Sequence, residues 1–276
     1  MSRETLVFQA RLAQQCGRDE DLLGTMRVLT SQLDEELSEE ERALLSVALK
    51  NVLQRLRSSI TIAKAIEMRE HQLASDVNAK IARAYVKKLC LELLAFCEDT
   101  IAFVRRRVDR VPGVDSPIDA RVFYLKLLGD YYRYICEIGT SMDFKELGID
   151  RAKDAAPCAS NCYRAGIELA SALPFTDPTR LGLYLNETVF LYEIMGNKRG
   201  AIDITQACLN QAIEARPMLE NDESKLEETE AIIQLLSNNL TLWTQELEHN
   251  RVNNPRTASA DHPSDETLDL EKLHLR

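Results

Sequence analysis

Residues 38–57 read SEEERALLSVALKNVLQRLR and predict a long helix with a defined start. Ser38 followed by Glu41 forms a capping box, in which each side chain satisfies a backbone N–H at a helix N-terminus. Apolar residues then recur at helical spacing, at Leu45, Leu49, Val52 and Leu56. This pattern indicates an amphipathic helix with one buried face.

The residues on either side extend the helical pattern. No Gly or Pro occurs between Gly24 and Pro112, and the whole chain of 276 residues has only 10 Gly and 8 Pro. Strand-and-turn architectures would punctuate such a stretch repeatedly. A second long helix is therefore expected from about Ser75 to the basic run at 105–107, and the fold class is predicted to be all-α.

Further helix starts follow from capping signals. Ser116-Pro117 and Asp177-Pro178 each place a cap before a proline at the first helical position, Gly196-Asn197 separates two helices, and Asn221-Asp222 precedes the last. We expect about nine helices, including two short ones before Ser38. Residues 1–247 should form the helical domain and 248–276, which are mostly polar, a flexible tail.

Charge and composition narrow the class of partner. The net charge of −10 disfavours nucleic acid and anionic lipid as ligands. The start, Met-Ser-Arg-Glu, lacks the apolar core of a signal peptide, and no apolar run approaches the roughly 18 to 20 residues that cross a bilayer. We expect a soluble intracellular protein that is located in the cytoplasm, and also in the nucleus as a further option, and that binds no nucleic acid and no membrane.

Residues suited to catalysis or metal binding are scarce. The four histidines are His71, His249, His262 and His274, and three of them lie in or beside the tail. No glycine-rich phosphate loop, dinucleotide fingerprint or His-Glu-x-x-His motif occurs. The seven cysteines, an odd number, suit reduced thiols, most of them (Cys16, Cys90, Cys97, Cys136 and Cys208) in helical cores. Cys158 and Cys162 have no histidine near them in the sequence, so we expect no metal site. Because residues suited to catalysis are scarce as well, we expect that the protein is not an enzyme.

Two pairs of basic residues carry the functional signal. Lys50 and Arg57, and likewise Lys126 and Arg133, are seven residues apart, which places each pair on one helix face about 10 Å apart. One interpretation is a solvated face on which acids such as Asp130 and Glu137 supply ordinary ion pairs. The other is that two helices direct these groups into one groove, where guanidiniums and a tyrosine hydroxyl bind phosphate.

Longer blocks of sequence carry a resemblance to a known family. They are ERALLSVALKNV (41–52), VFYLK (122–126), GDYYRY (129–134), RLGLYLN (180–186), YE (192–193) and QLLSNNLTLWT (234–244). Together they resemble the 14-3-3 family over the whole helical region. The resemblance implies a cup-shaped, right-handed array of nine antiparallel helices that dimerises through its first four helices, within residues 1–100.

The resemblance also implies a function and a set of site residues. The function is that of an adaptor that binds phosphoserine or phosphothreonine segments of client proteins in a concave groove and modulates their activity or location. No cofactor is implied. The residues that match the phosphate-binding positions are Lys50, Arg57, Arg133 and Tyr134, with Lys126 beside them. Those that match the peptide-backbone and groove positions are Asn186, Asn239, Glu193, Leu185, Val189, Ile232, Leu235, Leu242 and Trp243. For each leucine, core packing is an equally good interpretation.

The implied dimer interface lies near the N-terminus. Arg18 and Asp21 match its charged positions, with Glu92 and Lys88 as their expected partners on the other subunit. Leu12, Cys16 and Tyr85 complete this set. Thr5 replaces an acidic residue of the family, so one ion pair between subunits is expected to be lost. The dimer is expected to form with a second copy or with a paralogue.

Three features leave alternatives open. Thr61 and Ile60 stand where the family has a basic residue and a tryptophan, so weaker phosphate attraction is expected, and a scaffold for acidic or unphosphorylated peptides is the alternative function. A hydrolase that uses groove carboxylates is a third, weaker hypothesis.

In the tail, Arg256 precedes Ser259 by three residues, as in a kinase site, so a phosphorylated tail could bind its own groove. A chance Arg-x-x-Ser match is the alternative.

Overall fold

The computed structural model describes the chain except residues 34, 111–115, 143, 148–153, 220–222 and 254–276. The described residues contain helices and no strand, so the all-α prediction is confirmed. The α-helices are α1 (Arg3–Gln15), α2 (Asp19–Gln32), α3 (Glu39–Gln72), α4 (Asp76–Arg110), α5 (Ile118–Ser141), α6 (Phe144–Leu147), α7 (Ala155–Ala170), α8 (Pro178–Glu193), α9 (Lys198–Ala215) and α10 (Glu223–Asn253). A short 3₁₀ helix, Arg216–Leu219, links α9 to α10. Nine helices match the prediction, and the four-residue α6 is additional.

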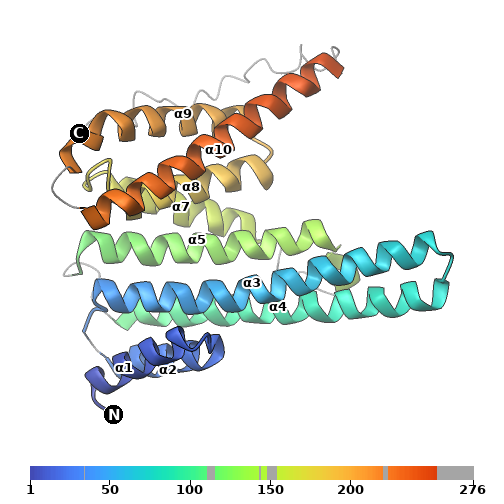
Figure 1. The fold of residues 1–276 in the computed structure, drawn as a ribbon, viewed down its shortest axis with the longest axis horizontal. Coiled ribbons are helices and arrows are strands. Elements are labelled where there is room, and N and C mark those ends of the chain that lie inside the picture. Colours follow the sequence, from blue (N-terminus) through green and yellow to red (C-terminus); the bar gives the residue numbers. More distant parts are fainter. Residues whose placement is uncertain (34, 111–115, 143, 148–153, 220–222, 254–276) are drawn as a thin grey trace.

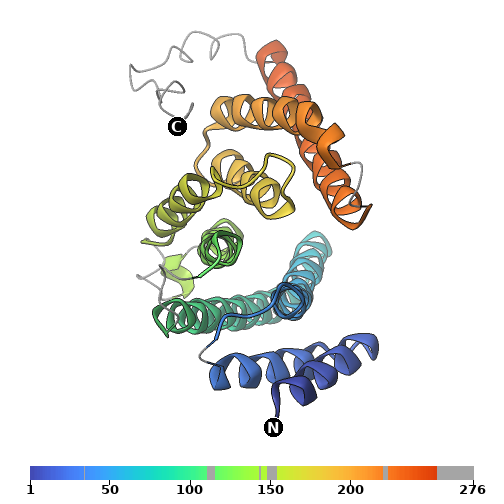
Figure 2. The same cartoon turned by 90° about the vertical axis from the view of Figure 1, so that its left-hand side faces the viewer.

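The helices stack in an order that follows the chain. Figure 1 shows α1 and α2 at one end, then the long α3–α4 hairpin, then α5, with α7 to α10 beyond it. The perpendicular view shows the layers following an arc, with α3 and α10 on its inner side (Figure 2). Helix α5 contacts α4 on one side and α7 and α8 on the other, so it joins the two halves of the array.

The apolar cores also divide the array at α5. A large core joins α1 to α5, and it includes Leu45, Leu49 and Tyr131. Smaller cores hold α5, α7 and α8 together around Tyr163, and α8, α9 and α10 around Leu236.

Among the described helices, none combines the length and apolar character that a membrane span requires.

Most of the predicted capping signals are present. Ser38 and Glu41 form the reciprocal capping box at the start of α3. The Asp177 side chain accepts from two backbone N–H groups at the start of α8, with proline at the first helical position. The Asn197 side chain caps α9 and follows Gly196, whose φ of 67° lies in the left-handed region that favours glycine.

One expectation about a helix start is wrong. Pro117 lies at the cap position of α5 and not at its first helical position, and no side-chain hydrogen bond caps this helix. The Ser116 hydroxyl instead donates to Oε2 of Glu36 at 3.3 Å. At the other end, α10 continues to Asn253 and so includes the first six residues of the predicted tail, 248–276. Asn221, Asp222 and Ser259 lie outside the described residues.

The cysteine prediction is correct for some thiols and wrong for others. All seven cysteines are free, and Cys90, Cys97 and Cys208 are buried. Cys136 is half-buried, whereas Cys16 is exposed because it caps the C-terminus of α1 on the outer surface of the protomer.

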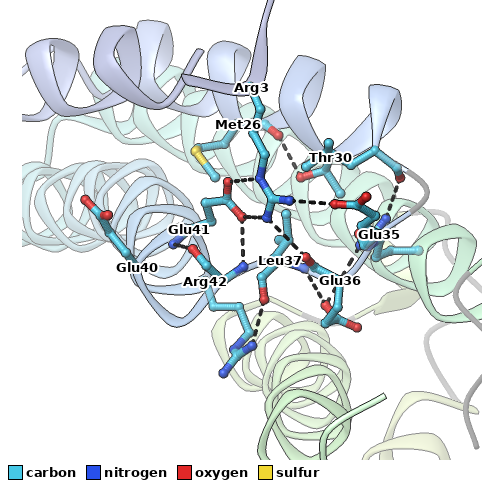
Figure 3. Close-up of polar contacts among 12 residues, drawn as sticks. Arg3, Met26, Thr30, Glu35, Glu36, Leu37, Glu40, Glu41 and Arg42 are labelled. Atoms are coloured by element: carbon cyan, nitrogen blue, oxygen red, sulfur yellow. Dashed lines mark hydrogen bonds and ion pairs between the residues drawn. The ribbon is translucent and has the colours of Figure 1, made fainter. Parts of the chain in front are cut away.

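Arg3 ties α1 to the start of α3 through the capping box (Figure 3). Its Nε and Nη2 atoms donate to the two oxygens of Glu41 at 2.7 and 2.6 Å. The backbone N–H of Ser38 donates to Glu41 Oε2 at 2.8 Å. Burial alone would raise the pKa of Glu41, but the hydrogen bonds from Arg3 and Ser38 lower it below its ordinary value.

Replacing this carboxylate should therefore cost stability in a pH-dependent way. We expect Glu41→Gln to lower the free energy of unfolding by about 1 to 3 kcal/mol at pH 7, because a charge-assisted hydrogen-bond pair is lost. A carboxylate with a lowered folded-state pKa stabilises the fold above its ordinary pKa of 4.5, and this contribution is lost as the pH falls through the lower folded-state pKa. Urea unfolding at pH 7 and pH 3.5 would measure the effect.

The matched control is the neighbouring Glu40→Gln. Glu40 pairs with Arg11, and both side chains are exposed. Exposed pairs contribute little, so the control should unfold almost as the wild type does. Equal losses in the two variants would contradict a special role for Glu41.

Candidate functional site

Arg57, Arg133 and Tyr134 meet where α3 faces α5. Arg57 Nη2 lies 2.7 Å from Oε2 of Glu137, and Arg133 forms an ion pair with the other oxygen of the same carboxylate. Both guanidiniums lie over the Tyr134 ring, with their central carbons 5.3 Å (Arg57) and 4.4 Å (Arg133) from its centroid. The structure thus brings together two helices' basic residues around one tyrosine, and we call this set the arginine pair.

A second network centres on Asp130 and joins the arginine pair to α7 and α8. Lys126 Nζ lies 2.8 Å from Asp130 Oδ2, and Asn186 Nδ2 donates to both Asp130 oxygens at 2.8 Å. The Tyr163 hydroxyl donates to Asp130 Oδ1 at 2.7 Å and accepts from Arg133 Nε at 3.3 Å. Asp130 therefore positions predicted site residues from two helices, α5 and α8.

The protonation states suit anion binding. Burial alone would lower the pKa of Arg133, but the surrounding tyrosines and carboxylates raise it above its ordinary value. Burial raises the pKa of Tyr134 to about 12, so its hydroxyl stays protonated. The site therefore presents two permanent guanidinium cations and a phenol that can donate, which are the groups that bind a phosphoryl oxygen well.

The remaining α3 residues lie on the surface or in the core. Lys50 is exposed, two helical turns before Arg57 on the same face. Thr61 is exposed one turn after Arg57, and its hydroxyl donates to the Arg57 carbonyl at 3.1 Å. Ile60 is only 6% exposed and belongs to the core. Thr61 therefore leaves a neutral side chain at the edge of the arginine pair.

Helices α8 and α10 form the apolar side of the predicted groove. Leu185 and Ile232 are partly buried against the same small core, and Val189 packs on the cluster that contains Tyr192. Leu235 and Leu242, by contrast, are 50% and 53% exposed. Asn239 is half-buried on α10 and Glu193 is exposed at the end of α8. Leu235 and Leu242 are therefore the most exposed part of the predicted apolar wall.

Trp243 lies behind this wall and not on its surface. It is 3% exposed and stacks on Tyr192, with ring centroids 4.5 Å apart and planes inclined by 9°. The Tyr192 hydroxyl donates to Glu246 Oε2 at 2.7 Å. In this arrangement Trp243 supports the packing of α8 on α10.

Sequence reasoning missed the residues that organise the site. Asp130 and Glu137 were expected only as ordinary ion-pair partners, and Tyr163 was not singled out. One signal was available, because Gly129 sits inside α5, where glycine is unfavourable by about 0.5 to 1 kcal/mol relative to alanine. A Cβ atom on Gly129 would lie 2.8 Å from Cε1 of Tyr163, so this glycine allows the tyrosine to approach.

A carboxyl on α8 also escaped notice. Burial raises the pKa of Glu187 on α8 to about 7. Its charge adds to the effect of burial in raising the pKa of Tyr184 on the same helix and of Cys208 on α9. Burial raises the pKa of Cys208 to about 12, so this thiol is protonated at neutral pH. Within the described ranges, no three His, Cys, Asp or Glu side chains gather as a metal site would require.

The residues predicted for the dimer interface are exposed on the protomer. Leu12 and Tyr85 are 51% and 53% exposed, and Cys16 is exposed as well. Arg18 pairs with Asp21 at 2.8 Å and Lys88 with Glu92 at 3.7 Å, each pair within its own segment. An apolar groove of about 510 Å³ lies between α3 and α4, and its lining includes Ile62, Ile66, Ile81 and Tyr85.

The close approach at Gly129 gives a direct test of the Asp130 network. Gly129→Ala should force the Tyr163 ring away from its bonds and lower the free energy of unfolding by about 1 to 3 kcal/mol. The matched control is Gly24→Ala in α2, where nothing lies within 4 Å of an added Cβ atom. That substitution should stabilise by about 0.5 to 1 kcal/mol. Chemical denaturation of both variants would decide, and a neutral Gly129→Ala would contradict the packing described.

Comparisons with known proteins agree with this architecture. A family model described as "14-3-3 protein" matches residues 9–244. The chain is 36% identical over 265 residues to 14-3-3-like protein GF14 epsilon of Arabidopsis thaliana, covering 96% of this chain and 98% of that protein. It is 37% identical to 14-3-3 protein beta/alpha of Xenopus tropicalis (89% and 95% covered) and 36% identical to checkpoint signal transducer rad25 of Schizosaccharomyces pombe (91% and 88%). The chain therefore belongs to the 14-3-3 family.

Proposed function

We propose that this chain is an adaptor that binds phosphoserine or phosphothreonine segments of client proteins in the groove between α3, α5, α8 and α10. Members of the family act as phosphopeptide-binding adaptors and not as enzymes. The observation that carries the proposal is the arginine pair, in which two guanidiniums from different helices converge beside Tyr134. Binding would change the activity or location of the client protein. We expect this chain to act in the cytoplasm.

A phosphate carries more negative charge than the Glu137 carboxylate that now binds the arginine pair, so the arginines should bind phosphate more strongly. Glu137 offers one negative charge to both arginines, whereas a phosphate ester carries about −1.5 to −2 at pH 7. A guanidinium has five N–H donors, so a phosphate oxygen can begin to bind each arginine before Glu137 is displaced. The Tyr134 hydroxyl would donate to a further oxygen, and Lys50 would add a long-range cation.

The peptide backbone would lie along α8 and α10. Asn186 is held by Asp130 beside the arginine pair, and its amide oxygen can still accept from a peptide N–H. Asn239 would act similarly from α10. Client side chains would contact the exposed Leu235 and Leu242, where burial of apolar area adds affinity.

A second candidate function rests on Thr61. Because this residue is neutral and lies one turn from Arg57, the local field is weaker than a basic residue would make it. Acidic or unphosphorylated peptides could then compete with phosphopeptides. The affinity of an acidic peptide relative to the phosphopeptide separates the two functions.

We also propose that the chain dimerises through α1 to α4, as members of the family do. The apolar groove between α3 and α4 and the exposed Leu12 on α1 supply complementary surfaces. Two copies related by a twofold axis would use each surface once, so the contact forms twice.

Phosphate recognition can be measured by fluorescence polarisation. A phosphoserine peptide with arginine at −3 and proline at +2 should bind much more tightly than its unphosphorylated form. Arg57→Ala and Arg133→Ala should each weaken binding by roughly 10- to 100-fold, since a charge-assisted hydrogen bond contributes about 1.5 to 3 kcal/mol. The control Arg199→Ala removes an exposed arginine that pairs with Asp203 on α9, and it should bind normally. Equal affinity for both peptides would refute the adaptor proposal.

Thr61→Arg tests whether the edge position matters. A guanidinium one turn from Arg57 should increase phosphopeptide affinity by a few-fold and make it more sensitive to salt, because the new charge is exposed. The matched control is Thr61→Gln, which has a long polar side chain without charge. If the two variants bind alike in low and high salt, position 61 does not couple to the site.

A further inference from the structure

The end of the α3–α4 hairpin exposes an unusual amount of apolar surface. Leu73, Val77 and Ile81 are 67%, 71% and 64% exposed. In Figure 1 this end of the hairpin projects beyond α5, and none of the other helices that the structure describes covers it. Single exposed apolar residues are common, but a contiguous group of them indicates an interaction surface.

This apolar surface continues the groove between α3 and α4. Val77, Ile81 and Tyr85 recur every four residues on α4 and form one stripe, and the last two also line the groove. Lys88 and Glu92 follow on the same stripe at helical spacing. The stripe therefore runs from an apolar end at the hairpin to a charged end near Glu92.

Helix α1 carries a complementary stripe. Phe8 and Leu12 lie one turn apart on one face and are 65% and 51% exposed. Thr5 precedes them on this face, and Arg18 and Asp21 follow just beyond the helix. This stripe also has an apolar end and a charged end.

Charge complementarity fixes how the two stripes would align in the dimer proposed above, on which this inference rests. Arg18 and Asp21 of one copy would face Glu92 and Lys88 of the other. Phe8 lies about two turns, or roughly 10 Å of helix, before the end of α1 at Gln15, and Arg18 and Asp21 come after that end. Two turns back from Lys88 along the α4 stripe lies Ile81, with Val77 one turn further, so alignment of the charged ends places Phe8 at the apolar end of that stripe.

We propose that Leu73, Val77 and Ile81 receive Phe8 of a second copy of this chain, and that this uncharged contact makes pairing selective for that copy. A partner subunit with a charged side chain at the position of Phe8 or of Val77 would have to bury that charge unpaired, which is unfavourable. Thr5 adds no charge at this end of the contact, so it could not neutralise that charge. The twofold axis repeats the contact, which doubles its effect on pairing.

Charge substitution at both places tests the contact. Phe8→Lys and Val77→Glu change exposed residues, so both variants should fold, which circular dichroism would verify. Sedimentation equilibrium should show the dimer dissociation constant of each variant raised at least tenfold over wild type. A 1:1 mixture of the two variants should recover pairing, because the new ammonium then faces the new carboxylate at one of the two contacts. Ile213→Lys, at a 56%-exposed site on α9, is the matched control and should dimerise as wild type does.

The outcomes separate this inference from the proposals on which it rests. Unchanged dissociation constants for Phe8→Lys and Val77→Glu would overturn it while leaving the dimer intact. Weakened variants that do not recover on mixing would overturn the pairing of Phe8 with Val77. A wild-type chain that stays monomeric at micromolar concentration would refute the dimer itself. Phosphopeptide binding, measured on the same samples, would show independently whether the adaptor function holds.

Discussion

Arg133 is a cation placed inside an all-helical protein, and its neutralisation fixes how the helices meet. The residue is 6% exposed, and taking a guanidinium out of water is costly unless charges and hydrogen bonds compensate. Glu137 on α5 and the Tyr163 hydroxyl on α7 provide direct partners, and Asp130 holds Tyr163 in place. Asn186 on α8 and Arg57 on α3 are connected through these carboxylates. One buried charge thus sets the relative position of four helices.

The apolar cores make this arrangement possible because they leave α5 between two separate clusters. The large core holds the α4 side of α5, and the Tyr163 core holds the α7 side. Ion-pair networks of this kind add little net stability, but an incompletely satisfied network is unfavourable and so disfavours other packings. Stability therefore comes mainly from burial, and the polar network specifies the register of α5 against α7 and α8.

Local signals in the sequence were reliable, and signals that depend on distant partners were not. The capping box at Ser38 and the cap at Asp177 are satisfied within a few residues, so their chemistry is visible in the sequence. Ser116 failed as a cap because Glu36, eighty residues earlier, takes its hydroxyl. The site divides in the same way. The spacing of Lys126 and Arg133 predicted a basic stripe, but the bond between Tyr163 and Asp130 joins residues that only the tertiary fold brings together.

The placement of Glu137 has a kinetic consequence. This carboxylate is tethered beside both arginines, so it is always present at high effective concentration and replaces any ligand that begins to leave. For the proposed phosphopeptides, the arginines pass from one anion to another without an intermediate in which they are bare. Such an internal competitor lowers the barrier to dissociation, so it would favour rapid exchange of clients over long residence times.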